Sequence, residues 1–431
     1  MAMPINRNRP TIMHIDLNSC FATVEQQANP LLRGKPLAVA AYDSPNGCIV
    51  SPSIEAKRCG IKTGMPVREG RLLCPELIVR TPDPEKYRDV HLKFGRLFRE
   101  YSPDVTPKSI DEAVLDFSGT VHLEHDLLQV GREIKRRVRA EIGEWISCNI
   151  GIGTNRFLAK LAASLHKPDG LDEITHENLE AIYADKELLD LCGINTRYQA
   201  RLNVHGIYTP LQLLQAPLHV LKGQVFRSIN GYYWFLRVRG YEVDQVVFDR
   251  KSFGQQYTLK RPTNDPEELS RILMKLCEKL GRRLRRAGQA AQGIHVAAAY
   301  RDYSHWHQGK RVGGELFATL ELYRKAQLLL NGRTGKDQII THLGVSCYEL
   351  VPSNRAQPDL FEAGESRERR IACAADEIND RYGEFIITPA IMLGMEQMVL
   401  DRISYGNVKE LEDLYAHESR AQHTIPNPAA P

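Results

Sequence analysis

Apolar and polar residues along the first 170 positions follow strand and helix periods in turn. The apolar run within 11–17 and the alternating run over 113–117 each predict a buried strand. The first strand is followed by a predicted helix and a second strand before residue 42. Further helices are predicted over the segments 54–58, 87–101 and 127–142. The N-terminal part is therefore expected to mix helices with sheet.

From residue 171 the pattern changes to short helices, which are predicted over 178–183, 186–191, 197–202 and 211–214. The stretch from Leu191 to Ile207 resembles a helix-hairpin-helix, which offers backbone N–H groups to a DNA phosphate without reading bases. Gly193 and Asn195 occupy the places of its two usual glycines. Asparagine tolerates a positive φ better than most residues, so the turn is expected to persist. An ordinary helical connection explains the stretch equally well.

A connector over 240–252 leads to a second mixed segment. Strands are predicted over 252–259, 293–300 and 339–348, with a helix over 320–330. Another helix, expected to start at a capping signal formed by Asn264 and Glu267, ends in an arginine-rich turn. These elements predict a βαββαβ-like order.

Length and charge add two constraints. A chain of 431 residues is long enough for two to four domains. Its 57 Lys/Arg and 53 Asp/Glu give a net charge of +4, but 14 of these cations against 6 acids fall within residues 249–311. Residues 353–431 carry 8 cations against 14 acids. This asymmetry favours a basic surface for a polyanion and an acidic tail, with a solvated basic helix as the alternative.

Nine dispersed cysteines without a CxxC pair argue against a disulfide framework or a zinc site and for a reducing compartment. The first ten residues are polar, and no apolar run approaches the ~20 residues of a membrane helix. We therefore expect a soluble cytoplasmic protein with no membrane contact.

The candidate chemistry lies in three carboxylates at the two strands first described. Asp16 stands near the end of one strand, and Asp111 and Glu112 precede the other. If the strands are neighbours, the three acids converge, and hard divalent cations such as Mg²⁺ are needed to neutralise them. Two such ions about 4 Å apart suit in-line attack on a phosphate. Because successive strand residues face opposite ways, Asp111 and Glu112 share a site only at a turn or bulge.

These motifs carry a resemblance to a known family. Asp16 to Phe21 with Val24-Glu25, the block 109–113, and the block 151–162 followed by Lys167-Pro168-Asp169-Gly170 resemble the Y-family translesion DNA polymerases, in order and spacing. The resemblance spans roughly residues 11–361. It implies an α+β multidomain, right-hand polymerase. Its parts would be a palm (1–19 and 81–170), fingers (20–80), a helical thumb (171–240), a linker (241–251), an α+β little finger (252–352) and a clamp-binding peptide with an acidic tail (353–431).

The resemblance also implies an activity. The chain would transfer deoxynucleotides to a primer 3′-hydroxyl as an error-prone translesion polymerase, by phosphoryl transfer without proofreading. Asp16 and Asp111 would bridge two Mg²⁺ ions, which Mn²⁺ can replace. Glu112 would complete the site that activates the hydroxyl, and the Leu17 carbonyl would contact the nucleotide-bound ion. The expected partners are primer–template DNA and deoxynucleoside triphosphates, bound by a monomeric core.

Other family positions are assigned in the same way. Ser51, Lys57 and Lys160 match triphosphate-contacting positions, and Arg58 is adjacent to them. Ile54 departs from the family, because many members have there a tyrosine that bonds the phosphates. Phe21 matches the steric gate that excludes a ribose 2′-hydroxyl, and a plain core phenylalanine is the alternative.

The contacts with DNA and with a sliding clamp complete the list of expectations. DNA contacts are expected at the hairpin glycine and asparagine and at four arginines, namely Arg282, Arg283, Arg285 and Arg286. The stretch from Gln357 through Leu360 to Phe361 resembles the bacterial clamp-binding peptide, in which the apolar pair fills a groove and the glutamine fixes the register. A plain loop is the alternative.

Two rival functions use the same fold features. A catalytically silent polymerase-like protein would bind DNA and the clamp, but such relatives lose the metal carboxylates. A nucleotide cyclase has a palm but needs neither the basic segment nor the hairpin. Both are therefore disfavoured.

Overall fold

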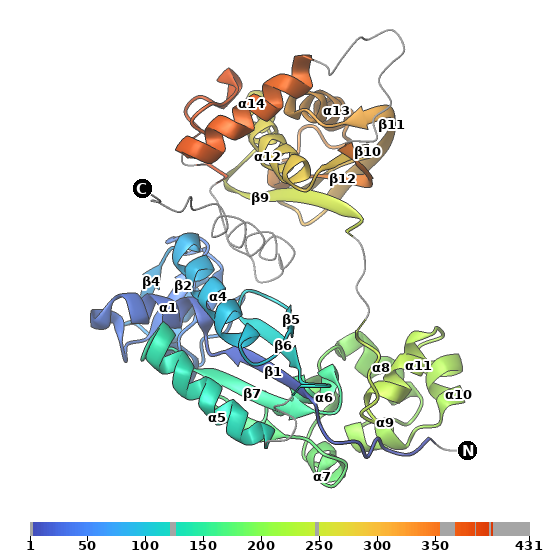
Figure 1. Cartoon of the computed structure of the whole chain (residues 1–431). Coiled ribbons are helices and arrows are strands. Elements are labelled where there is room, and N and C mark those ends of the chain that lie inside the picture. Colours follow the sequence, from blue (N-terminus) through green and yellow to red (C-terminus); the bar gives the residue numbers. More distant parts are fainter. Residues whose placement is uncertain are drawn as a thin grey trace, which may run out of the picture. The chain divides into compact units, whose positions relative to one another are not determined.

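A computed structural model describes residues 3–120, 126–245, 250–353, 367–383, 385–395 and 398–399. The chain divides into two compact units, residues 1–246 and residues 247–401 (Figure 1). Each unit has its own apolar core and is considered by itself below.

The first unit is built on a five-stranded sheet of order β5-β6-β1-β7-β8. Its strands are β5 (Asp104–Pro107), β6 (Glu112–Asp116), β1 (Ile12–Leu17), β7 (Cys148–Gly153) and β8 (Leu171–Glu173). Central β1 is antiparallel to both β6 and β7, whereas β7 and β8 are parallel. The two strands predicted from apolar patterning are thus direct neighbours, as the candidate chemistry requires.

Alternation along β1 separates the two faces of this sheet. Met13, Ile15 and Leu17 are buried in the main core, together with side chains of α1 (Cys20–Ala28), α4 (Pro84–Arg99) and α5 (Leu127–Arg137). Ile12 instead packs against Ala159 of α6 (Arg156–Ala162). Because residues two apart share a face, His14 and Asp16 lie on the side of α6.

Helix α6 lies close to the sheet because glycines in β7 leave it room. A Cβ on Gly151 would come within 2.1 Å of the Ala159 carbonyl oxygen, and one on Gly153 within 2.6 Å of the Ala159 nitrogen. Any larger residue at either position would push the helix away from the carboxylates.

A small three-stranded sheet of order β3-β2-β4 forms the neighbouring part of the first unit. Its strands are β2 (Leu37–Ala40), β3 (Ile49–Pro52) and β4 (Ile78–Arg80), and its helices are α2 (Ile54–Arg58) and α3 (Val67–Leu73). Ser53 begins α2 by accepting a hydrogen bond from the Ala56 N–H. The helix predicted over 54–58 is confirmed.

The rest of the first unit is helical around a core that contains Tyr183 and Trp234. Its helices are α7 (Leu179–Ala184), α8 (Thr196–Val204), α9 (Pro210–Gln215), α10 (Leu218–Val220) and α11 (Asn230–Arg237). The predicted helix over 186–191 is wrong, because that segment forms only a 3-10 turn at Leu188–Asp190.

The second unit has a four-stranded antiparallel sheet of order β11-β10-β12-β9, covered on one face by α12 (Pro266–Arg286) and α13 (Thr319–Asn331) (Figure 1). The strands are β9 (Ser252–Thr263), β10 (Gln289–Tyr300), β11 (His305–Leu316) and β12 (Ile340–Pro352). The structure has the expected βαββαβ order, although β11 was not among the three predicted strands. Helix α12 starts one residue later than predicted, because Asp265 rather than Asn264 caps it through the Glu267 N–H.

A last described helix, α14 (Arg367–Tyr382), packs beside α12. Asp376 and Asp380 of α14 pair with arginines of α12, while Ile371 and Tyr382 of α14 are exposed. Within the described part of the chain, no helix is both long and apolar enough to cross a bilayer.

Candidate active site

The three predicted carboxylates meet where β1 and β6 pair. Asp16 lies opposite Glu112 in the antiparallel ladder, and the Leu17 N–H donates to the Asp111 carbonyl oxygen at 2.9 Å. Glu112 is the first residue of β6, and Asp111 lies in the turn before it, as the argument from strand geometry required. The Ser109 hydroxyl donates to Asp111 Oδ1 at 2.5 Å and holds that carboxyl in the turn.

Mutual repulsion and burial act on these acids. Burial, together with the nearby Asp16 and Glu112 charges, raises the pKa of Asp111 to about 6, although the Ser109 hydrogen bond acts in the opposite direction. Burial also raises the pKa of Asp16. Burial alone would raise the pKa of Glu112, but the hydrogen bond and charge of Lys160 and the charge of Lys167 outweigh it, so that the pKa is lowered overall. The cluster therefore holds negative charge that needs cations.

Three lysines surround this cluster. Lys160 Nζ lies 2.7 Å from Glu112 Oε2, and Lys167 forms an ion pair with Asp16. Partial desolvation and then the Lys167 charge lower the pKa of Lys57, while Asp16 and Asp111 act in the opposite direction. Lys57 and Lys160 were predicted for this site. Lys167 belongs to one of the family motifs, but no role was predicted for it. Its place in the same motif block as Lys160 was the available signal.

The donor set fits a hard divalent cation, because it consists of carboxylate oxygens that repel one another. As the side chains stand, no group of three His, Cys, Asp or Glu residues in the described ranges converges closely enough to hold an ion. Glu112 and Asp16 are instead paired with Lys160 and Lys167, respectively.

His14 is a further site residue that the sequence analysis did not assign. It is almost fully buried, and its Nε2 lies 3.8 Å from Glu112 Oε2. Burial lowers the pKa of His14 to about 3, so the ring is neutral near pH 7. Its place two residues before Asp16 on one strand face was the signal that could have identified it.

The loop that carries Lys167 is held in place by residues of α5, of the helical turn after it and of β7. Lys135 Nζ donates to the Gly170 carbonyl oxygen at 3.1 Å and pairs with Asp169 at 3.0 Å. Arg139 also binds the Asp169 carboxylate, and Asn149 accepts from the Gly170 N–H at 3.0 Å. These contacts fix the loop on both sides of its turn.

The other predicted nucleotide residues lie around the same place with varied exposure. Ser51 is buried, with its hydroxyl 3.4 Å from the Ala22 N–H, and Arg58 is exposed at the end of α2. Ile54 is the first residue of α2. Phe21 is fully buried and stacks on Tyr87 with a centroid separation of 4.4 Å. The structure thus places Phe21 in the core, and its role as a gate remains a prediction.

The predicted hairpin differs from the expected turn. Gly193 has a φ of +98°, whereas Asn195 has an extended φ of −103° and caps α8 through the Tyr198 N–H at 2.9 Å. The expectation of a positive φ at Asn195 was wrong, because its side chain serves the helix start directly. The exposed helix start remains compatible with a phosphate contact and with an ordinary connection.

The predicted DNA-binding arginines of α12 are largely engaged inside the second unit. Arg282 is 3% exposed and lies 2.8 Å from Asp380, and Arg285 lies 2.6 Å from Asp376. Arg286 also pairs with Asp380, and Arg283 donates to the Gly254 carbonyl oxygen at 2.7 Å. The expectation of an exposed arginine face is corrected for Arg282 and Arg285, which acids of α14 bind. The predicted clamp peptide, Gln357 to Phe361, lies outside the described residues.

The chain is similar in sequence to known proteins over most of its length. The sequence matches the impB/mucB/samB family over residues 15–164 and that family's C-terminal domain over residues 250–360. It is 34% identical to DNA polymerase IV of Pelotomaculum thermopropionicum, over 89% of this chain and 96% of that protein. Identity to DNA polymerase IV 1 of Bacillus subtilis is 30%, over 90% of this chain and 94% of that protein.

Solved structures agree on the fold. A Y-family DNA polymerase chimera of Dbh and Dpo4 aligns with a TM-score of 0.69 at 24% identity, covering 79% of this chain and 99% of that chain. The insertion ternary complex of Dbh DNA polymerase aligns with a TM-score of 0.54 at 23% identity over the same shares. The predicted α+β polymerase fold is confirmed.

Proposed function

The chain belongs to the impB/mucB/samB family of bacterial Y-family translesion DNA polymerases, and we propose that its Asp16, Asp111 and Glu112 carry template-directed nucleotide transfer. The single observation that carries this proposal is the pairing of Asp16 with Glu112 at the point where the Asp111 turn meets β1. It gathers three acids from distant parts of the chain at one end of a sheet.

Because their oxygen donors suit hard divalent cations, the three carboxylates and the Leu17 carbonyl oxygen would hold a pair of Mg²⁺ ions, with Mn²⁺ as a substitute. When bound, such ions supply charge neutralisation and a lowered pKa for the primer hydroxyl. Ser109 and the β1–β6 ladder keep the acids in place before any ligand arrives.

The lysines would hold the triphosphate of the incoming nucleotide. Lys57, Lys160 and Lys167 lie around the carboxylates and carry charge opposite to that of the phosphates. Ser51 in β3 and Arg58 at the end of α2 lie close in sequence to Lys57. Ile54 offers no donor there, so we expect the γ-phosphate to be held by lysines rather than by a hydroxyl.

We assign the five-stranded sheet to the palm, the three-stranded sheet to the fingers, the helices after residue 171 to the thumb and the second unit to the little finger. The five-stranded sheet includes β8 (Leu171–Glu173), so we extend the palm slightly beyond the expected boundary at residue 170. We also propose that this polymerase lacks proofreading, because its sequence shows no exonuclease motif.

We propose that the second unit contacts DNA through the face of its sheet that α12 and α13 leave uncovered, rather than through the arginines of α12. Core side chains such as Val296 and Leu343 lie on the helix-covered face, so His295 and His342 lie on the opposite one. Glycine and alanine separate these histidines, for example Ala297 and Gly344, and keep that face flat. Duplex DNA has room there, whereas Arg282 and Arg285 are covered.

The Gln357–Phe361 peptide would tether the polymerase to the sliding clamp. Replacing Leu360 and Phe361 by alanine should shorten the products made with the clamp and leave synthesis without the clamp unchanged. Unchanged product length with the clamp would rule out the tether.

Primer extension tests the main proposal. The wild type, with Mg²⁺ and four deoxynucleoside triphosphates, should extend a primer, and Asp111→Ala should reduce the rate by at least about 10³-fold. Asp116→Ala, at the opposite end of β6 from the cluster, is the matched control and should retain activity. Equal activity of wild type and Asp111→Ala would contradict the assignment, and inactive wild type would favour the silent accessory protein.

A further inference from the structure

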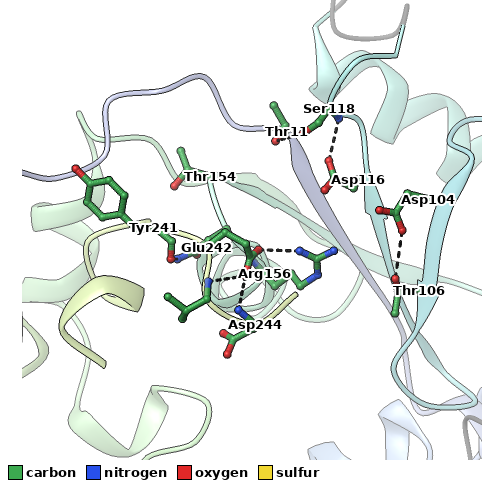
Figure 2. A network of polar contacts seen from close by, with 12 residues as sticks. Thr11, Asp104, Thr106, Asp116, Ser118, Thr154, Arg156, Tyr241, Glu242 and Asp244 are labelled. Atoms are coloured by element: carbon green, nitrogen blue, oxygen red, sulfur yellow. Dashed lines mark hydrogen bonds and ion pairs between the residues drawn. The ribbon is translucent and has the colours of Figure 1, made fainter. Parts of the chain in front are cut away.

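The start of the connector between the two units is fastened to the helix that carries Lys160 (Figure 2). Glu242 Oε2 accepts hydrogen bonds from the Arg156 backbone N–H at 3.0 Å and from the Arg156 guanidinium at 2.9 Å. Glu242 Oε1 accepts from the N–H groups of Val243 and Asp244 at 2.9 and 2.7 Å. One carboxylate therefore spans the first turn of α6 and the connector backbone.

Residues just before α6 add to this attachment. Asn155 caps α6 with Oδ1, and its Nδ2 donates to the carbonyl oxygens of Arg237 and Tyr241, each at 2.9 Å. The Thr154 hydroxyl donates to the Gly240 carbonyl oxygen at 2.8 Å. Gly240 has a φ of +83°, and a Cβ there would come within 2.5 Å of Thr154 Oγ1, so only glycine allows this approach.

The attachment matters because α6 is short. Seven residues form few internal hydrogen bonds, so the position of such a helix depends on its surroundings. Arg156 is only 7% exposed, and Glu242 is the carboxylate that pairs with its charge. One turn further on, Lys160 projects from the same helix to Glu112 at 2.7 Å.

We propose that Glu242 is a positioning residue, which fastens the connector to α6 and thereby holds Lys160 against the catalytic carboxylate Glu112. This inference rests on the proposed function for the role of Lys160. It also places residues 241–244 of the predicted 241–251 linker in the first unit, so that a movement of the second unit must be absorbed after Asp244 or else reach α6.

Asp244 offers a matched control. Its carboxylate pairs with Arg237 at 2.8 Å, and only its backbone N–H binds Glu242, so Asp244→Ala leaves the contact with α6 intact. Glu242→Ala removes that contact, and Glu242→Gln keeps an acceptor oxygen while it removes the charge.

The test combines amide hydrogen exchange over residues 155–162 with single-turnover nucleotide incorporation by the full chain. For Glu242→Ala we expect faster exchange in α6 and a roughly tenfold lower rate at saturating nucleotide, with primer–template affinity unchanged, because small displacements of a positioning group reduce rate more than binding. Glu242→Gln should be intermediate, and Asp244→Ala should match the wild type in both readouts.

Two results would overturn the inference. The first is unchanged exchange in α6 in both Glu242 variants. The second is faster exchange with an unchanged rate in a variant that melts like the wild type. If the wild type itself incorporates no nucleotide, the proposed function fails. Amide hydrogen exchange in α6 then still tests whether Glu242 holds that helix in place.

Discussion

At the scale of single residues, Asp111 carries a charge that the folded protein disfavours. Its pKa is raised from 3.8 to about 6, mainly by burial. A carboxyl whose pKa is higher in the folded state stabilises the fold below its unfolded pKa and loses that contribution as pH rises through the folded value. The metal-free protein should therefore lose stability between about pH 4 and pH 6 through this group.

Asp111→Asn tests this cost. In the presence of a chelator at pH 7.5, the variant should be more stable than the wild type by up to about 3 kcal/mol, following the size of the pKa shift. Its advantage should shrink toward pH 4, where the wild-type carboxyl is protonated. Thermal or urea unfolding measures it, with Asp116→Asn as control. A less stable Asp111→Asn at pH 7.5 would contradict the electrostatic account.

Substitution of Phe21 tests whether this residue acts as a steric gate or only as part of the core. Because its ring is fully buried against Tyr87, Phe21→Ala should cost about 3–5 kcal/mol of unfolding free energy. Phe94→Ala, at another buried ring, should cost a similar amount. Only the Phe21 variant should raise the ratio of ribonucleotide to deoxynucleotide incorporation. Equal ratios in both variants would leave Phe21 with a structural role alone.

At the scale of elements, the attachment of α14 to α12 depends on buried ion pairs. Asp376→Ala would leave Arg285, whose side chain is nearly inaccessible, without its carboxylate partner and should destabilise the second unit by about 3–5 kcal/mol. Glu368→Ala removes a more exposed pair between α14 and Arg324 and should cost about 1 kcal/mol or less. Chemical unfolding of both variants provides the comparison, and equal losses would show that the α14 contact is not organised around Asp376.

Patterning predicted the elements whose cores are strongly apolar and missed those that neighbours define. The strand β1 and the helix α4 were predictable from their own sequence. Strand β11 was not, because this edge strand is polar and rich in glycine, so its conformation comes from pairing with β10. The arginines of α12 were predicted as exposed because their acidic partners lie about ninety residues later in the chain.

The candidate site likewise combines residues that could be predicted from the sequence with contacts that could not. The carboxylates could be predicted because a motif marks them and two adjacent strands bring them together. The contacts of Lys167 and His14 could not, because they depend on a loop turn and on burial beneath α6. The connection from Glu242 to Lys160 runs through a helix terminus, which no local pattern reveals.

At the scale of the whole molecule, the chain combines a unit that carries the three proposed catalytic carboxylates with a second unit that we propose to contact duplex DNA. The connector starts at α6, the helix that carries Lys160 beside Glu112. The central claim nevertheless concerns the first unit alone, because all three carboxylates lie there.

Counting bound metal ions tests that claim most directly. Mn²⁺ is paramagnetic, so electron spin resonance can count the ions bound to the full chain with a 3′-deoxy-terminated primer–template and the matching deoxynucleoside triphosphate. We predict two ions per wild-type chain, a loss of at least one in Asp111→Asn, and two again in Asp116→Asn. The same number of bound ions in wild type and Asp111→Asn would contradict the account.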